Sequence, residues 1–156
     1  MQKVKDVMAK EVISVKRSAT LAGLLKLFKD FHSFPLVPVV DGRGKLAGSV
    51  SLPNILEVFS TPQPQLLKAI PFLDEQKDDI FDVELDADMG KIVIVDDIMN
   101  KDYLFIDEDA PLDQTYYQMK QHQVERLPVV NKEGVLVGMI GIFDIVRSLF
   151  RERGII

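Results

Sequence analysis

An internal repeat is the feature of this sequence that most constrains its fold. Residues 36–54 align with residues 126–144, and residues 4–8 align with residues 95–99. The aligned pairs include residues that shape strands and turns: Pro38 with Pro128, Gly44 with Gly134, and Gly48 with Gly138. A repeated unit of this size buries its apolar surface by packing against the other copy. The sequence therefore predicts two similar units joined in one chain.

Each unit carries the pattern of two strands and a helix. In the second copy, residues 127–130 are apolar and rich in β-branched side chains, which predicts a buried strand. Residues 131–134 are typical of a turn, in which Gly134 is free to adopt positive φ. Residues 135–140 predict a second strand, so the two strands form a hairpin. After Phe143 the apolar residues recur at helical spacing.

A strand and an amphipathic helix precede each hairpin. We expect strands at residues 12–15 and 103–106. Ser18 and Asp109 are expected to cap the helices that follow. The predicted buried positions repeat at helical spacing and are Leu21, Leu24, Leu25, Phe28 and either Phe31 or His32 in the first copy, and Leu112, Thr115, Tyr116 and Met119 in the second. A further helix is expected at residues 53–59, with Pro53 in its first turn.

Composition narrows the class of protein. The chain has 156 residues, 47% of them hydrophobic, and a net charge of -5. This charge makes it a poor candidate for binding nucleic acid or an anionic membrane. The chain has no cysteine, which excludes disulfides and thiolate chemistry. No N-terminal stretch resembles a signal peptide, and no apolar run approaches the length of a spanning helix, so we expect a cytoplasmic protein.

An acidic stretch separates the two copies. We predict that residues 61–94 are a linker, with a short helix at residues 65–70. Its carboxylates are opposed only by Lys77 and are Asp74, Glu75, Asp78, Asp79, Asp82, Glu84, Asp86 and Asp88. Such a run is either a solvated linker or a site for a cation or a partner, because hard cations prefer oxygen ligands.

The paired motifs resemble those of a known family. Val-x-Asp-(Val/Ile)-Met, strand, helix, Pro-Val-Val, glycine turn, Gly-hydrophobic-hydrophobic and helix occur twice, as in a tandem pair of CBS domains, or Bateman module. The resemblance implies an α/β (α+β) fold of two β-α-β-β-α repeats packed about a pseudo-twofold axis. It divides the chain into a first motif at residues 1–60, the linker at 61–94 and a second motif at 95–156. It also implies two clefts that bind AMP, ADP, ATP or S-adenosylmethionine.

The family's ligand motif is Gly-h-h-Ser/Thr-x-x-Asp, where h is hydrophobic. The hydroxyl residue begins a helix, where free N–H groups favour phosphate, and the aspartate accepts from ribose hydroxyls. The second copy has the aspartate as Asp144 but Gly141 in place of the hydroxyl. The first copy has the hydroxyl as Ser51 but Asn54 in place of the aspartate. Residues of these types at a helix start are also capping residues, which need no ligand.

An arginine distinguishes the second copy. Arg126 precedes Leu127 and Pro128, and it resembles the arginine that the AMP-activated kinase gamma subunit uses on nucleotide phosphates. A guanidinium suits phosphate geometry. The alternative is a surface ion pair with Glu125 or Asp144. Because Leu36 takes the place of Arg126 in the first copy, we expect unequal clefts with one dominant site.

Three functional hypotheses follow. The first is a regulatory module, with no cofactor and no metal, that senses an adenosine-containing ligand and signals to a separate, unidentified protein. The second is a structural dimerisation or docking module with degenerate clefts, and the third is a divalent-cation sensor that uses the acidic linker. We expect a homodimer in each case, and no catalysis, because no nucleophile–base pair is recognisable. His32 and His122 are interpreted as helix C-terminal histidines rather than a pH switch.

Overall fold

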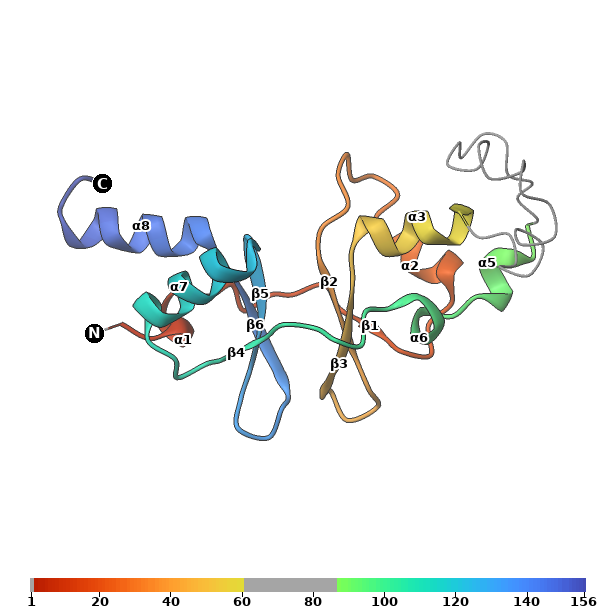
Figure 1. Cartoon of the computed structure of the whole chain (residues 1–156), viewed down its shortest axis with the longest axis horizontal. Helices are drawn as coiled ribbons and strands as arrows, with labels where there is room; N and C mark the ends of the chain where they lie inside the picture. The colour runs from red at the N-terminus through yellow and green to blue at the C-terminus, as the bar shows by residue number, and fades with distance from the viewer. Residues whose placement is uncertain (1, 61–86) are drawn as a thin grey trace.

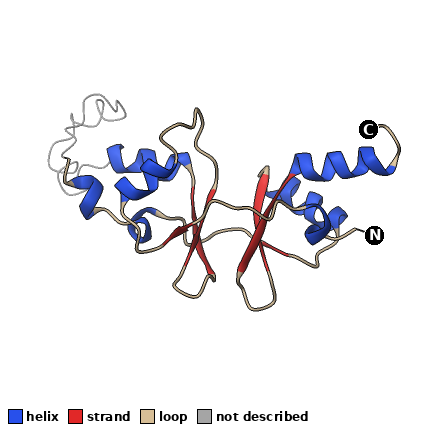
Figure 2. Cartoon of the chain, turned by 180° about the vertical axis from the view of Figure 1, so that it is seen from behind, coloured by secondary structure: helices blue, strands red, loops and turns tan. Residues whose placement is uncertain are grey.

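The computed structural model describes residues 2–60 and 87–156 of the chain. Within this part, two three-stranded sheets lie side by side at the centre of an elongated molecule, and helices cover their outer sides (Figure 1). The view from behind shows the same arrangement, with both sheets between two groups of helices (Figure 2). The predicted mixture of helices and sheets in two repeats is confirmed.

The first sheet has the order β1-β2-β3, formed by β1 (Val15–Lys16), β2 (Val37–Val40) and β3 (Leu46–Val50). The second has the matching order β4-β5-β6, formed by β4 (Ile106–Asp107), β5 (Arg126–Val130) and β6 (Leu136–Gly141). In each sheet the first pair is parallel and the second antiparallel. A parallel pair needs a crossover, and a helix supplies it in both copies: α2 (Leu21–Leu27) and α7 (Leu112–His122).

The two hairpins meet at their turns about the pseudo-twofold axis. Gly44 and Gly134 have φ of 81° and 80°, a backbone conformation that residues with a Cβ rarely adopt. The N–H of Leu46 donates to the carbonyl of Gly134 over 3.0 Å, and the N–H of Leu136 donates to that of Gly44 over 3.1 Å. The turn glycines therefore shape each hairpin and also join the two sheets.

The N-terminal segment of each repeat packs on the other repeat. Helix α1 (Val4–Val7) lies against the second repeat, where the N–H of Val4 donates to Ala110 over 3.0 Å. Helix α6 (Val95–Ile98) lies against the first repeat, where the N–H of Val95 donates to Ala19 over 2.8 Å. Val4 belongs to the core of the second sheet, and Val95 to the core of the first. Each hydrophobic core is thus built from both copies.

Two aligned glycines make room for these crossing segments. Ala9 and Met139 exchange backbone hydrogen bonds of 2.9 and 3.0 Å, and a Cβ on Gly138 would lie 2.7 Å from the carbonyl oxygen of Ala9. Asn100 and Ser49 exchange equivalent bonds of 2.8 and 3.1 Å, and a Cβ on Gly48 would lie 3.0 Å from the carbonyl oxygen of Asn100. Real Cβ atoms rarely approach so closely, so both positions need glycine.

Several local predictions were wrong at the helix starts. Helix α2 is capped by Thr20, whose side chain accepts from the N–H of Gly23 over 3.1 Å, and not by Ser18. Helix α7 has Pro111 at its N-cap, while Asp109 forms a salt bridge of 2.9 Å with Lys5. The carboxylate of Asp109, which the sequence pattern predicted to cap α7, therefore pairs with Lys5 of the N-terminal segment instead. Both leading strands also begin later than predicted, at Val15 and Ile106.

Some positions predicted to be buried are exposed, either within a helix or beyond its end. Tyr116 is 43% exposed, although Leu112, Thr115 and Met119 of the same helix are buried as predicted. Leu25 and Phe31 of the first repeat are also exposed. Helix α2 ends at Leu27, so His32 lies in the loop beyond it, whereas His122 is the last residue of α7.

The remaining helices flank the sheets. Helix α3 (Leu52–Ser60) follows β3, and α8 (Ile142–Glu152) follows β6. The short α5 (Met89–Ile92) packs on α2, where a Cβ on Gly90 would lie 3.0 Å from Cβ of Ala22. The predicted helix at residues 65–70, and the acidic run apart from Asp88, lie outside the described residues. No helix in the described part is long and apolar enough to cross a membrane.

Candidate ligand-binding cleft

A cleft of about 690 Å³ lies between the repeats. The second repeat contributes Arg126, Gly141 and Asp144, which the sequence singled out. The opposite wall comes from two segments of the first repeat, residues 9–13 and 31–36. Residues 9–13 reach this position because the chain passes here from α1, on the second repeat, to β1, in the first. The exchange of N-terminal segments therefore creates one wall of the cleft.

The start of α8 holds Asp144 in a defined orientation. Its Oδ2 accepts from the backbone N–H of Gly141 over 2.8 Å, and its Oδ1 accepts from Nη2 of Arg147 over 2.6 Å. The Arg147 guanidinium also lies 5.3 Å from the centre of the Phe143 ring. A carboxylate has about four lone-pair sites, so about two remain for a ligand. Asp144 can therefore cap its helix and still accept from two hydroxyl groups.

Arg126 is exposed at the beginning of β5, opposite Gly141 in the strand register. Within the described residues its guanidinium forms no salt bridge, since Asp144 pairs with Arg147 instead. The alternative of an ion pair with Glu125 or Asp144 is thus not what the structure contains in this part of the chain. Arg126 lines the cleft as a cation without a protein counter-ion among these residues.

Leu127 and Pro128 lie behind the cleft and do not line it. Both are buried in β5, and Leu127, which is 1% exposed, belongs to the core of the second repeat. Their role here is to hold the strand that presents Arg126.

The candidate residues of the first repeat lie elsewhere, at the start of α3. The backbone N–H and the hydroxyl of Ser51 both donate to Oδ1 of Asn54, over 2.8 and 2.9 Å. An amide oxygen has two lone pairs, and both are used here. Asn54 therefore lacks the spare acceptor sites that Asp144 keeps, and the capping interpretation accounts for the contacts of Ser51 and Asn54.

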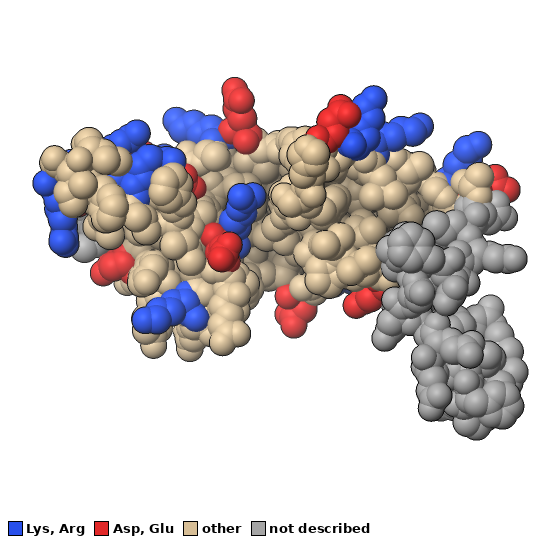
Figure 3. All heavy atoms as spheres, turned by 90° about the horizontal axis from the view of Figure 1, so that it is seen from above, with Lys and Arg blue, Asp and Glu red and all other residues tan. Residues whose placement is uncertain are grey.

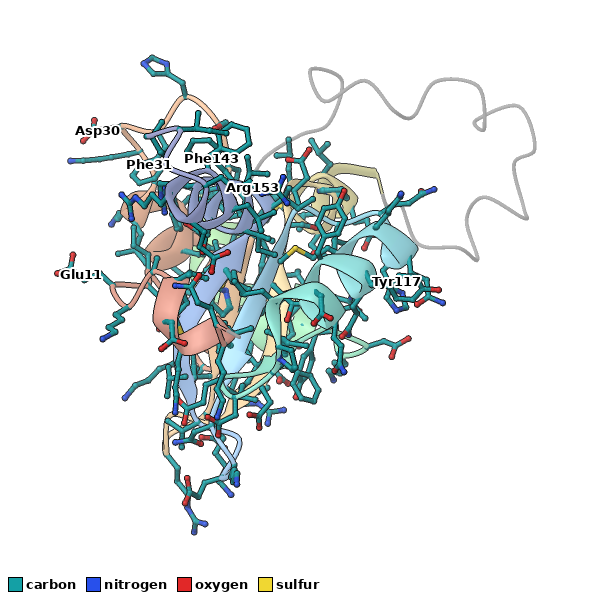
Figure 4. The ribbon with its side chains drawn as sticks, turned by 90° about the vertical axis from the view of Figure 1, so that its left-hand side faces the viewer. Glu11, Asp30, Phe31, Tyr117, Phe143 and Arg153 are labelled. Carbon is teal, nitrogen blue, oxygen red and sulfur yellow. The ribbon has the colours of Figure 1, made fainter. Side chains whose placement is uncertain are left out.

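Sequence reasoning missed several residues of the first repeat that line the cleft, among them Glu11, Val12, Ile13 and Phe31. It also missed Phe143, which is 69% exposed at the start of α8. Figure 4, a view along the long axis, shows Phe31 and Phe143 near each other in its upper part and Glu11 below them on the same side, and all three residues line the cleft. The Phe31 ring packs edge-to-face on buried Phe28, with centroids 5.0 Å apart. No local pattern marks Glu11, Val12 and Ile13 as cleft residues, because only the exchange of N-terminal segments brings them to the cleft.

A preformed metal site is not present among the described residues, in which no three His, Cys, Asp or Glu side chains are placed to hold an ion. This applies to the carboxylates of the cleft, which are Glu11, Glu125 and Asp144. Of the acidic run only Asp88 falls within the described part, so a cation site in that run stays a prediction.

Comparison with known proteins agrees with this architecture. The sequence profile of the CBS domain matches residues 4–61 and 95–151. The chain belongs to the CBS-domain family. An uncharacterized protein of Methanocaldococcus jannaschii, MJ1426, is 26% identical to this CBS-domain pair over 155 residues, covering 94% of this chain and 90% of that protein.

Two solved structures share the fold of this CBS-domain pair. The crystal structure of CBSX2 in complex with AMP has a TM-score of 0.70 at 20% identity, covering 98% of this chain and 99% of that one. The CBS domain pair of MJ0100, in complex with 5′-methylthioadenosine and S-adenosyl-L-methionine, has a TM-score of 0.62 at 20% identity. It covers 97% of this chain and 98% of that one. These likenesses establish the fold.

Proposed function

We propose that this CBS-domain pair is a regulatory module that binds an adenosine-containing ligand in the cleft between its repeats. The observation that carries the proposal is that Arg126, without a protein counter-ion among the described residues, and Asp144, with acceptor sites to spare, line the same cleft. The structurally similar CBSX2 was crystallised with AMP, and the MJ0100 pair with 5′-methylthioadenosine and S-adenosyl-L-methionine.

The lining suggests how such a ligand lies. Val12, Ile13, Phe31 and Phe143 provide an apolar surface for the base, and exposed aromatic rings favour stacking with a planar ring. The ribose hydroxyls donate to the spare lone pairs of Asp144. Arg126 then lies at the 5′ end of the ligand, where a guanidinium binds a phosphate or carboxylate.

The same lining supports binding rather than catalysis. The described residues that line the cleft include no Ser, Thr, Cys, His, Lys or Tyr, so none of these nucleophiles stands next to a base in the lining. We therefore propose that ligand occupancy changes how the two repeats sit together and that a separate protein responds to the change.

A homodimer is the second part of the proposal. Helices α3 and α8 expose apolar side chains at Leu52, Leu56, Leu149 and Phe150, each between 41% and 47% exposed. Figure 3 views the molecule from the side on which these helices lie, and uncharged surface separates the charged groups there. Exposed apolar surface of this kind supports a protein interface. A docking module without a ligand would expose the same apolar surface. A ligand-binding measurement is therefore what distinguishes the two hypotheses.

Isothermal titration calorimetry with adenosine, AMP and 5′-methylthioadenosine tests the proposal. We expect saturable binding of at least one compound, with one dominant site per chain. The matched variants are Asp144→Ala, which removes the free acceptors, and Asn54→Ala, which removes an acceptor that is already saturated. Binding lost in Asn54→Ala and kept in Asp144→Ala would place the site in the other repeat. No binding of any of the three would overturn the ligand proposal and leave the docking module.

A further inference from the structure

We infer that the cleft selects against nucleoside diphosphates and triphosphates, and takes adenosine ligands whose 5′ group carries at most a single phosphate. The inference rests on the proposed function, since it names the class of adenosine ligand for the same cleft. It is argued from three observations, which concern the charge of the cleft walls, the hydrogen-bond donors at the start of α8, and metal ions.

The first observation is the charge of the walls. Glu11, Glu125 and Asp144 line the cleft as carboxylates, and among the described lining residues Arg126 is the single cation. Arg147 offsets part of the Asp144 charge through its salt bridge of 2.6 Å. Arg126 can neutralise one phosphate group. Each further phosphate adds negative charge in a space where Glu11 and Glu125 have no compensating cation in the lining.

The second observation is that several hydrogen-bond donors at the start of α8 are not available to a phosphate. A helix N-terminus binds phosphate through its free backbone N–H groups. Here the N–H of Gly141 donates to Asp144 over 2.8 Å, and the N–H of Ile142 donates to the carbonyl of Glu125 over 2.9 Å. Gly141 also stands where the family motif has a hydroxyl. A phosphate chain at this helix start therefore loses three of the donors that would otherwise hold it.

The third observation concerns metal ions. A divalent cation could bridge carboxylates and phosphates and cancel the repulsion. No three acidic or histidine side chains of the described residues could hold an ion together, so this part of the chain has no preformed metal site. Magnesium that is already bound to the phosphates needs no such site and cancels part of their charge. The repulsion is therefore largest for the metal-free nucleotide.

The test is a comparison of dissociation constants for 5′-methylthioadenosine, AMP and ATP, measured by calorimetry on the full chain. The titrations are run in EDTA and again with excess magnesium. In EDTA we expect ATP to bind at least about tenfold more weakly than both other compounds, and excess magnesium should reduce that difference. ATP binding as tightly as AMP in EDTA would overturn the inference and leave the proposed function intact. Failure of all three compounds to bind would instead overturn the proposed function.

Charge variants give an independent readout. The double variant Glu11→Gln, Glu125→Gln keeps the shape of the cleft and removes two of its negative charges. The double variant should lower the ratio of the ATP dissociation constant to the 5′-methylthioadenosine dissociation constant by at least about threefold. Glu133→Gln, at the exposed hairpin turn of the second repeat, is the matched control and should leave this ratio unchanged. A ratio that stays the same in the double variant would show that charge does not cause the difference in affinity, and would overturn the inference.

Discussion

Arg147 donates to Oδ1 of Asp144 over 2.6 Å from one helical turn further along α8, and this contact orients the carboxylate at the cleft. The opposite oxygen of Asp144 accepts from the N–H of Gly141. Two constraints on one carboxylate leave it little freedom to rotate, so it is positioned before any ligand arrives. Preorganisation of this kind lowers the cost of ordering a side chain on binding.

Replacing Asp144 should remove most of the ligand affinity. A hydrogen bond to a charged group contributes about 1.5–3 kcal/mol, so Asp144→Ala should weaken adenosine binding by roughly 10-fold to 100-fold. The variant also loses a helix cap, which lowers the free energy of unfolding by about 0.5–2 kcal/mol. The ligand effect is therefore measured as the dissociation constant on folded protein, and not as a melting temperature alone. An unchanged dissociation constant would show that the carboxylate only caps the helix.

Arg126 should act on the 5′ group and not on the nucleoside. Arg126→Gln is expected to weaken AMP binding by about tenfold, because the phosphate loses a charge-assisted partner. Adenosine affinity should change by less than about threefold. Arg153→Gln, exposed beyond the end of α8, is the matched control for a loss of positive charge. Equal weakening of AMP and adenosine by Arg126→Gln would contradict the assigned role.

The crossing of the N-terminal segment makes Gly138 a sensitive position. A Cβ there would lie 2.6 Å from Sδ of Met8 and 2.7 Å from the carbonyl oxygen of Ala9. Since Ala9 contributes backbone, Gly138→Ala should lower the free energy of unfolding by about 1–3 kcal/mol in urea denaturation. Gly42→Ala is the control, because nothing lies within 4 Å of its added Cβ. A Gly138→Ala protein as stable as Gly42→Ala would mean that the segment is not held there.

Asp109 should contribute to the decrease in the free energy of unfolding at acid pH. The hydrogen bond and charge of Lys5 hold the pKa of Asp109 below its usual range, and the same contact raises the pKa of Lys5. A lowered folded-state pKa gives stability that is present above the unfolded-state pKa, about 3.9, and is lost as pH falls through the folded-state pKa. Asp109→Asn should therefore flatten the fall in stability below about pH 4, measured by urea denaturation. Because the pair is exposed, the effect should shrink at high salt.

The homodimer makes a separate prediction. Light scattering at micromolar concentration should give twice the mass of the chain. Leu56→Glu combined with Phe150→Glu should give the mass of a monomer, because the charges interrupt the apolar surface of α3 and α8. Lys132→Glu, in the hairpin turn of the second repeat, is the control and should remain dimeric. A wild-type protein that scatters as a monomer would remove this part of the proposal.

The sequence by itself determined the local structure of each repeat. Apolar periodicity located the hairpins and helices, and the turn glycines at Gly44 and Gly134 have the positive φ that was expected. It also placed Gly141 and Asp144 together at a helix start. These features depend on interactions over a few residues, where chain sterics and spacing leave few choices. The repetition of such local patterns predicted two similar units, and the resemblance of their motifs to CBS domains implied the tandem architecture.

Only the tertiary structure decided which segment packs on which repeat. Gly48 and Gly138 offer the same kind of gap, so the local pattern does not say that residues near Met8 cross Gly138 and residues near Met99 cross Gly48. This packing places Glu11, Val12 and Ile13 opposite Arg126 across the cleft. It also allows Asp109 to form a salt bridge with Lys5, so that Asp109 does not cap a helix. The physical reason is that apolar faces and charged groups of similar chemistry compete for the same partners over long sequence distances. The connectivity and packing of the whole chain select among them.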